Sequence, residues 1–415
     1  MVNIAQFLAF AAFAWQGSCA SSSSKLLFGE TIVAWDDKTE LPNVIQNGLI
    51  LVVDDRIQAV SSQAQPSHLP KDVEMINVSG QIITPGFEHN ASRVLPRHGE
   101  FAAAAHFRPK DVYLGQLAGL YEALNAGVTT TLDHAHHTWS NDTIYTGLNA
   151  SIVSGGRVFW AYAFHDIPAL NYTIVDQIPN FQEIAESSIL DGTNTELAIA
   201  YDSWGPEPGA EAKQIAGMVK EFNVSVLTTH YLAEPWGFGN LPEDVYPFDV
   251  LNGSVPVVFS HGSFITARGA RLLRYTHPHS YVFQDQAALG VDTHFTLSTD
   301  ILTQARIWLQ SAWYHFSDEV MSEWRIPRNN PMSVVQAFTL ATRSGGLALR
   351  RPDLGVIQVG AKADIVVWNA QESPALLGWT DPITSVILHA TVGDVLHVAV
   401  NGSFVKRDGK LTAKK

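Results

Sequence analysis

Short apolar runs recur along the whole chain, but their pattern differs between the two ends and the middle. Near the ends, apolar segments separated by turn residues lie at Leu26–Trp35, Leu49–Val60, Ala363–Trp368 and Val395–Val405, which predicts β-strands. In the middle, short apolar runs alternate with amphipathic stretches such as Lys110–Ala126. This alternation is typical of βαβ units around a parallel sheet.

The middle of the chain contains eight candidate strands. They are Gln81–Phe87, Val128–His134, Val158–Phe164, Leu197–Ser203, Ser225–His230, Val255–His261, Tyr281–Gln284 and Gly290–His294. Eight parallel strands with helices between them predict an α/β fold of the TIM-like (β/α)8 barrel type. Only residues 285–289 separate the last two candidates, whereas a parallel crossover needs a dozen or more residues. We therefore expect a distorted barrel.

A barrel of about 250 residues leaves two terminal segments of this 415-residue chain. Neither segment alone has enough strands for a stable sheet, so we expect the two to pair. The predicted organisation is a signal peptide over 1–20, a barrel over 81–350, and a small β-sandwich built jointly from 25–80 and 352–415.

The first twenty residues predict secretion. The apolar run Ile4–Trp15 is followed by Gly17, Ser18, Cys19 and Ala20, which is typical of a signal peptide cleaved after Ala20. Because no Lys or Arg precedes the run, a buried first strand or helix is the alternative. A secreted chain can carry glycans at surface Asn-x-Ser/Thr sequons. Such sequons begin at Asn77, Asn90, Asn141, Asn149, Asn171, Asn223, Asn252 and Asn401.

Composition narrows the partners and the chemistry. The formal net charge is -14, with no basic stripe, so binding to a phosphate backbone has no electrostatic drive. The apolar run near the amino terminus is too short to span a bilayer. Cys19 is the only cysteine, which excludes a catalytic thiolate and Cys-ligated zinc once the signal peptide is removed. We expect a small-molecule substrate, and neither a nucleic-acid nor a membrane partner.

Several segments carry a family resemblance. They are NGLILVVDDRIQAV and INVSGQIITPGFEHN near the amino terminus, LGQLAGLYEALNAGVTTTLDHAHHTWS and LGVDTH in the middle, and GVIQVGAKADIVVWNAQ and VLHVAVNGSFVKRDGKL near the carboxyl terminus. Together they resemble the amidohydrolase superfamily, in its deaminase and triazine-hydrolase-like branch. The resemblance implies a hydrolase that binds its substrate at the C-terminal mouth of the barrel.

The resemblance also implies a metal site with His ligands on the first, fifth and sixth strands and an Asp on the eighth. The matching positions are His230, His261 and Asp292, each at the end of an apolar strand. Imidazole and carboxylate ligands suit a single Zn²⁺ or Fe²⁺ that keeps a position open for water. In this reading Asp292 takes a proton from the water and His261 steadies the oxyanion. The alternative is that these are hydrogen-bonded strand-end residues.

The first-strand motif departs from the family. The family has His-x-His shortly after ITPGF, but the corresponding positions here hold Ala91 and Arg93, and a shift of two residues recovers only His89. An Arg at 4 Å would repel a divalent ion by about 4 kcal/mol per unit of its charge at an effective dielectric constant of 20. His134 and His136 are a substitute pair, since alternate residues of a strand project to the same side. The alternative is that they contact substrate.

Glu234 follows His230 by four residues, one residue later than the glutamate in the family's His-x-x-Glu. It is a candidate acid/base, or else a solvated loop acid.

Two functional hypotheses follow. The first is hydrolysis of a C–N bond in a small cyclic or heteroaromatic molecule by a metal-activated water. The second is a metal-free barrel that uses the same groups for acid/base isomerisation or cyclisation, with a non-catalytic binding protein as the remaining alternative.

Overall fold

The computed structural model describes residues 24–62, 69–91, 106–167, 170–205, 209–232, 239–263, 265–276, 287–292, 294 and 297–412. The predicted signal peptide over 1–20, Arg93, Glu234 and the candidate strand Tyr281–Gln284 lie outside these residues, and so do the side chains of His89, Asn90 and Ala91. None of the helices in the described ranges combines the length and the hydropathy that a membrane span requires.

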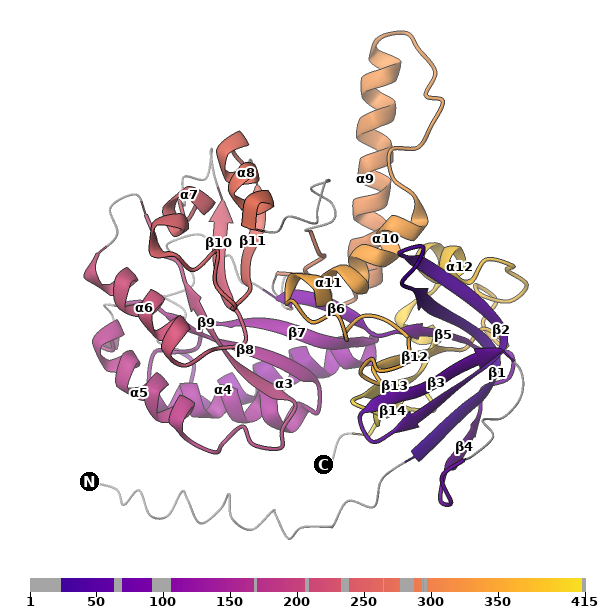
Figure 1. The fold of residues 1–415 in the computed structure, drawn as a ribbon, viewed down its shortest axis with the longest axis horizontal. Helices are drawn as coiled ribbons and strands as arrows, with labels where there is room; N and C mark the ends of the chain where they lie inside the picture. Colours follow the sequence, from indigo (N-terminus) through magenta and orange to yellow (C-terminus); the bar gives the residue numbers. More distant parts are fainter. Residues whose placement is uncertain are drawn as a thin grey trace.

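Six parallel strands form a curled sheet in the described part of the barrel, and they follow one another in chain order (Figure 1). They are β6 (Phe87–Ala91), β7 (Val128–Ala135), β8 (Arg157–Phe164), β9 (Thr195–Tyr201), β10 (Leu227–Leu232) and β11 (Val257–Ser263). Every residue of the central strand β8 is buried, as expected when both faces of a parallel sheet are covered. The predicted α/β fold with a TIM-like curled sheet is confirmed.

Helices follow these strands, and α3 to α6 lie along the outside of the sheet (Figure 1). They are α3 (Pro109–Asn125), α4 (Asn141–Ser154), α5 (Ile174–Glu186), α6 (Ala210–Glu221), α7 (Pro242–Val245), α8 (Ala267–Thr276) and a 3-10 turn at Tyr246–Phe248. The amphipathic stretch Lys110–Ala126 corresponds to α3, whose first residue is the proline that favours a helix start. Ser140 caps α4 by accepting a hydrogen bond from the Thr143 backbone.

Both ends of the chain contribute to one nine-stranded sheet. Its strands are β1 (Ser24–Asp36), β2 (Leu41–Val53), β3 (Arg56–Ser62), β4 (Glu74–Asn77), β5 (Ile82–Pro85), β12 (Ile365–Trp368), β13 (Val395–Val400), β14 (Ser403–Arg407) and β15 (Lys410–Leu411). The seam between the two ends is the antiparallel pair β5 and β12. We call this the end sheet.

The first barrel strand begins later than the sequence predicts. The apolar run Gln81–Phe87 divides at Gly86, so that β5 joins the end sheet while Phe87 opens the barrel. The Gly86 N–H donates to the Asp364 carbonyl at 3.0 Å, and a Cβ on Gly86 would lie 2.1 Å from the Thr129 Oγ1 atom. Because a side chain does not fit there, the chain changes sheets at a glycine.

A buried polar joint links the barrel to the end sheet. Arg157 of β8 pairs with Asp364, and both side chains are almost fully buried. Asp364 Oδ1 accepts the backbone N–H of Asn401 at 2.8 Å, and Asn401 Nδ2 donates to Asn194 Oδ1 at 2.7 Å. The Asn401 sequon is therefore part of this joint. The other sequons with described side chains are exposed, at Asn77, Asn141, Asn149, Asn171, Asn223 and Asn252.

Four helices follow the barrel strands: α9 (Ile301–Ser322), α10 (Val334–Ala341), α11 (Arg343–Ala348) and α12 (Pro382–His389), with a 3-10 turn at Val392–Asp394. Helix α9 projects from the body (Figure 1).

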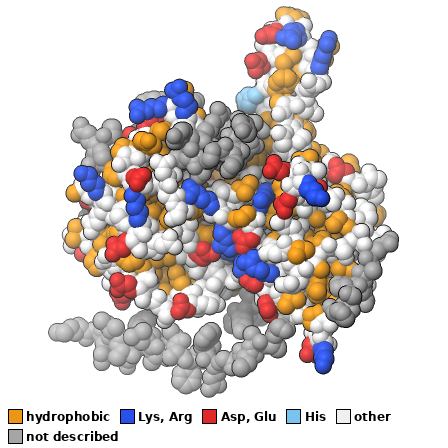
Figure 2. Space-filling model, viewed as in Figure 1, with side chains coloured by type: hydrophobic (Ala, Val, Ile, Leu, Met, Phe, Trp, Pro, Cys, Tyr) orange, Lys and Arg blue, Asp and Glu red, His pale blue; other side chains and the backbone are white. Residues whose placement is uncertain are grey.

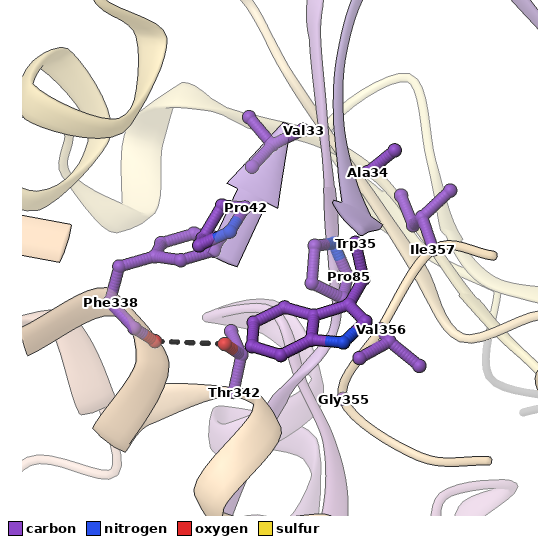
Figure 3. A pocket seen from close by; sticks show the side chains of 10 residues that line it. All are labelled: Val33, Ala34, Trp35, Pro42, Pro85, Phe338, Thr342, Gly355, Val356 and Ile357. Carbon is purple, nitrogen blue, oxygen red and sulfur yellow. Dashed lines mark hydrogen bonds between the residues drawn. The ribbon is translucent and has the colours of Figure 1, made fainter. Parts of the chain in front are cut away.

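Figure 2 shows acidic and basic side chains interspersed over the visible face. Trp35 and Phe338 line a small pocket between β1 and α10 (Figure 3). Its lining residues carry no ionisable side chain, so it is a packing gap.

Candidate metal centre

Three buried histidines from two strands gather at the C-terminal edge of the parallel sheet. His134 lies near the end of β7, His136 follows it directly, and His230 lies in β10. One ring nitrogen of each lies within 4.8 Å of the others. The ring centroids are 4.5 Å apart for His134 and His136 and 4.2 Å apart for His134 and His230. Since β8 and β9 separate β7 from β10 in the sheet, the curl of the sheet brings them together.

Asp202, directly after β9, contacts two of these rings. Its Oδ2 atom lies 2.7 Å from Nδ1 of His230 and 3.4 Å from Nε2 of His134. Its Oδ1 atom accepts the His230 backbone N–H at 2.7 Å and the Thr229 hydroxyl at 3.1 Å. Burial alone would raise the pKa of Asp202, but His230 and His134 hold it well below its ordinary value. The carboxylate therefore fixes the orientation of both rings.

The surroundings favour the neutral form of His134, His136 and His165. Burial lowers the pKa of His134, and it lowers the pKa of His136 further. The pKa of His165, which lies just after β8, falls to about 4 for the same reason. A neutral imidazole is the form that binds a metal ion or accepts a proton.

Two further histidines flank the group. The His165 ring centroid lies 5.8 Å from that of His136, and the His261 ring centroid lies 5.6 Å from that of His230. His261 is exposed at the end of β11 and has a backbone φ of 70°. Such left-handed backbone in a non-glycine residue is enriched at functional sites.

Of the site residues predicted from the sequence, some lie in the histidine group and others do not. His230 lies with the pair His134 and His136, which is the only group of this kind among the described residues. Asp292 is partly buried, has a φ of 62°, and is not a member of that group. The backbone of His89 pairs with Thr131 of β7. The roles of His89, His261, Asp292 and Glu234 stay predictions.

The sequence analysis missed Asp202 and His165. Both directly follow an apolar strand, Asp202 after β9 and His165 after β8. Strand ends are where barrel sites lie, so this position is the signal that could have found them. Neither residue belongs to the motifs of the family resemblance, which drew attention to other strands.

The three grouped histidines fit a zinc-type ion. The Nδ1 atom of His134 is buried and has no hydrogen-bond partner among the described residues, while its Nε2 atom faces Asp202. Imidazole nitrogens are ordinary ligands of Zn²⁺ and of Fe²⁺. The donor set therefore suits one such ion.

Comparison with known proteins shows the family of this chain. Residues 89–405, which are 317 of the 415 residues, match the sequence model of the Amidohydrolase family. The chain belongs to the amidohydrolase family. The resemblance inferred from the sequence is confirmed, and with it the interpretation as an amidohydrolase-type enzyme.

Two curated proteins show the range of the likeness. The 5-methylthioadenosine/S-adenosylhomocysteine deaminase of Pyrococcus horikoshii is 24% identical over 344 residues, which cover 74% of this chain and 75% of that enzyme. The imidazolonepropionase of Anaeromyxobacter dehalogenans is 35% identical over 74 residues, which cover 18% of this chain and 17% of that enzyme. The second match is thus confined to a short segment.

Solved structures match over nearly the whole chain. A mutant of atrazine chlorohydrolase from Arthrobacter aurescens, complexed with zinc and atraton, has a TM-score of 0.72 at 17% identity and covers 94% of this chain and 97% of that one. An adenosine deaminase from Xanthomonas campestris with bound zinc has a TM-score of 0.74 at 15% identity and covers 95% of each chain. At sequence identities this low, the structural similarity shows that the fold is shared and nothing further.

Proposed function

We propose that this enzyme hydrolyses a C–N bond of a small cyclic or heteroaromatic molecule at the C-terminal mouth of its barrel. The observation that carries the proposal is the buried group of His134, His136 and His230 at the strand ends of an amidohydrolase-family chain. Two of the similar proteins are deaminases of adenine-containing molecules by name, and a third holds the triazine atraton. These names support a nitrogen-containing ring as the substrate.

The donor set fits a single Zn²⁺ or Fe²⁺, and such an ion, when bound, supplies Lewis-acid activation of water. Asp202 then holds the rings of His230 and His134 in fixed orientations. His261 is exposed beside His230, where it can donate a hydrogen bond to an oxygen that gains negative charge. We assign proton transfer to Asp292 and Glu234, as the family resemblance implies.

The proposal is tested by turnover. Purified protein, supplied with zinc, is incubated with amino-substituted purines, pyrimidines and triazines and with cyclic amides, and products are followed by mass spectrometry and ammonia release. We expect turnover of at least one class and a loss of more than about 100-fold in kcat for His230→Gln, since removing catalytic groups has effects of this size.

The matched control is His315→Gln, which changes an exposed histidine on the projecting helix α9 and should leave kcat unchanged. Failure of the zinc-loaded wild-type enzyme on every class would contradict the proposal. So would equal activity of the His230→Gln and wild-type enzymes.

One observation favours a second candidate, the metal-free acid/base enzyme. The 2.7 Å contact between Asp202 and Nδ1 of His230 is the geometry of a carboxylate that orients a general base. The first-strand ligand position meanwhile holds Ala91. A metal-free acid/base enzyme should still isomerise or cyclise its substrate after exhaustive treatment with a chelator. The metal-dependent hydrolase should lose its activity under the same treatment.

A further inference from the structure

We propose that this chain binds its metal ion between His134, His136 and His230, so that the ligands come from the second and fifth barrel strands instead of the first. The inference names the metal ligands of the proposed hydrolase, and it rests on the proposed function only for the role of the ion in catalysis. The binding itself stands on the arrangement of the described residues and is measured without substrate.

The three rings place three nitrogen donors within 4.8 Å of one another. His134 and His136 are two residues apart on an extended segment and project to the same side, and their rings are stacked with an interplanar angle of 16°. His230 approaches from across the sheet, with its ring centroid 5.4 Å from that of His136. Zn–N bonds of about 2.0–2.1 Å in tetrahedral geometry place the nitrogens about 3.4 Å apart. Because the lone pairs lie in the ring planes and the rings are nearly parallel, the rings must turn before their nitrogens, now within 4.8 Å of one another, point at one ion.

One carboxylate selects the ligand atom of two rings. The hydrogen bond from Nδ1 of His230 to Asp202 commits His230 to bind an ion through Nε2. The contact between Nε2 of His134 and the same Oδ2 atom commits His134 to bind through Nδ1, the buried atom that has no hydrogen-bond partner among the described residues. A carboxylate behind a ligating histidine is a recurrent outer partner in metal sites. Asp202 is thus a positioning residue shared by two ligands.

The segments that carry the ligands are already held in place. Thr138, two residues after His136, donates its hydroxyl to the Ala163 carbonyl at 2.6 Å, and Gln177 donates to the Thr138 carbonyl at 3.0 Å. Asn240 donates to the His230 carbonyl at 3.0 Å. Binding an ion therefore requires ring rotation without rearrangement of the backbone, which favours affinity.

The alternative set from the family pattern is less compact in this chain. His261 is exposed, and Asp292 does not group with the histidines. The first-strand position that would complete that set holds Ala91. The pair on β7 replaces the missing pair on β6, the neighbouring strand, which leaves His261 and Asp292 for contacts with substrate.

The first experiment measures zinc affinity. Apo-protein is prepared with a chelator, dialysed, and titrated with ZnCl₂ in a calorimeter at pH 7.5. We expect one equivalent of zinc in the wild type. Asp202→Asn should weaken binding by about 10–100-fold, the usual effect of an outer partner, and His134→Gln and His136→Gln should weaken it more. The controls His165→Gln, His261→Gln and Asp292→Asn should stay within about threefold, well below that range.

Two results would overturn the inference. One is the opposite pattern, in which His261→Gln or Asp292→Asn abolishes binding while His134→Gln and His136→Gln keep it. The other is a folded wild-type protein that retains less than about a tenth of an equivalent of zinc, far below the stoichiometric binding expected of such a site.

A second measurement needs no variant and covers the case in which a substitution prevents folding. Wild-type crystals soaked in ZnCl₂ should show an anomalous peak between the rings of His134, His136 and His230. A peak beside His261 and Asp292, or no peak, would overturn the inference. If zinc occupies the site but no substrate is turned over, the proposed function fails alone. If the enzyme hydrolyses a substrate but zinc binds elsewhere or does not bind, the site inference fails alone.

Discussion

At the scale of single residues, Glu88 is the side chain least expected where it lies. It is 2% exposed in β6, and neither carboxyl oxygen has a hydrogen-bond partner among the described residues. Burial, and then the charge of Asp364, raise its pKa well above the ordinary value of 4.5, against the opposing effect of nearby arginines. Burial therefore favours the neutral form of Glu88 in the folded protein.

This gives a stability prediction with a definite sign. Below pH 4.5 Glu88 is protonated in both the folded and the unfolded protein, so its ionisation does not change the free energy of unfolding. As the pH rises above 4.5 only the unfolded chain gains by ionising, so the free energy of unfolding falls until the pH reaches the higher pKa of the folded state. Glu88→Gln removes this loss. We expect it to raise the free energy of unfolding at pH 7.5, and to raise it by less at pH 5.

Urea denaturation at the two pH values measures the effect. The matched control is Glu122→Gln, an exposed glutamate on α3, which should change the free energy of unfolding by no more than about 0.5 kcal/mol. If Glu88→Gln destabilises the protein at pH 7.5, Glu88 is ionised and held by the arginines near it.

At the scale of elements, the break between β5 and β6 depends on Gly86. A methyl group there would meet Thr129 Oγ1 at 2.1 Å and Cγ2 at 2.4 Å. The Gly86 N–H also bonds to the end sheet while Phe87 bonds to the barrel. We predict that Gly86→Ala lowers the free energy of unfolding by roughly 1–3 kcal/mol through overpacking, measured by urea denaturation.

Gly115 provides the comparison, because no atom lies within 4 Å of the position its Cβ would take in α3. Gly115→Ala should stabilise the protein by up to about 1 kcal/mol, the difference in helix propensity. Equal effects of the two substitutions would show that the close approach of Thr129 is not what requires a glycine at position 86.

At the scale of the whole molecule, the joint between barrel and end sheet decides where a secreted chain can carry glycans. Asn401 uses its backbone N–H and its Nδ2 atom within the joint, so a glycan on Nδ2 would remove the bond to Asn194 and wedge the joint open. Asn149 and Asn223 are exposed. We predict that the folded, exported protein begins near Ser21 and carries glycans at exposed sequons with Asn401 unmodified.

Peptide mapping by mass spectrometry after enzymatic deglycosylation, with N-terminal sequencing, tests this in a eukaryotic secretory host. Asn149 and Asn223 are the internal controls for glycosylation in that host. Full occupancy of Asn401 in protein that unfolds cooperatively would contradict the prediction, and an intact Met1 terminus would contradict export by this route.

The sequence by itself determined the class of fold and the strand ends that matter. The apolar runs that became β7, β8 and β10, the amphipathic stretch that became α3 and the residues His230, His134 and His136 were all readable, because period and local composition depend on neighbours in the chain. The same pattern could not divide Gln81–Phe87 at Gly86, since the reason lies in Thr129, a contact distant in sequence.

Only the tertiary structure decided how the site is assembled. Nothing in the segments around positions 134 and 230 shows that their rings lie 4.2 Å apart, or that Asp202 contacts both. Those contacts join strands that are not neighbours in the sheet. They follow from the curl of the whole sheet, which arises from the twist accumulated over its strands and leaves no local mark on the sequence.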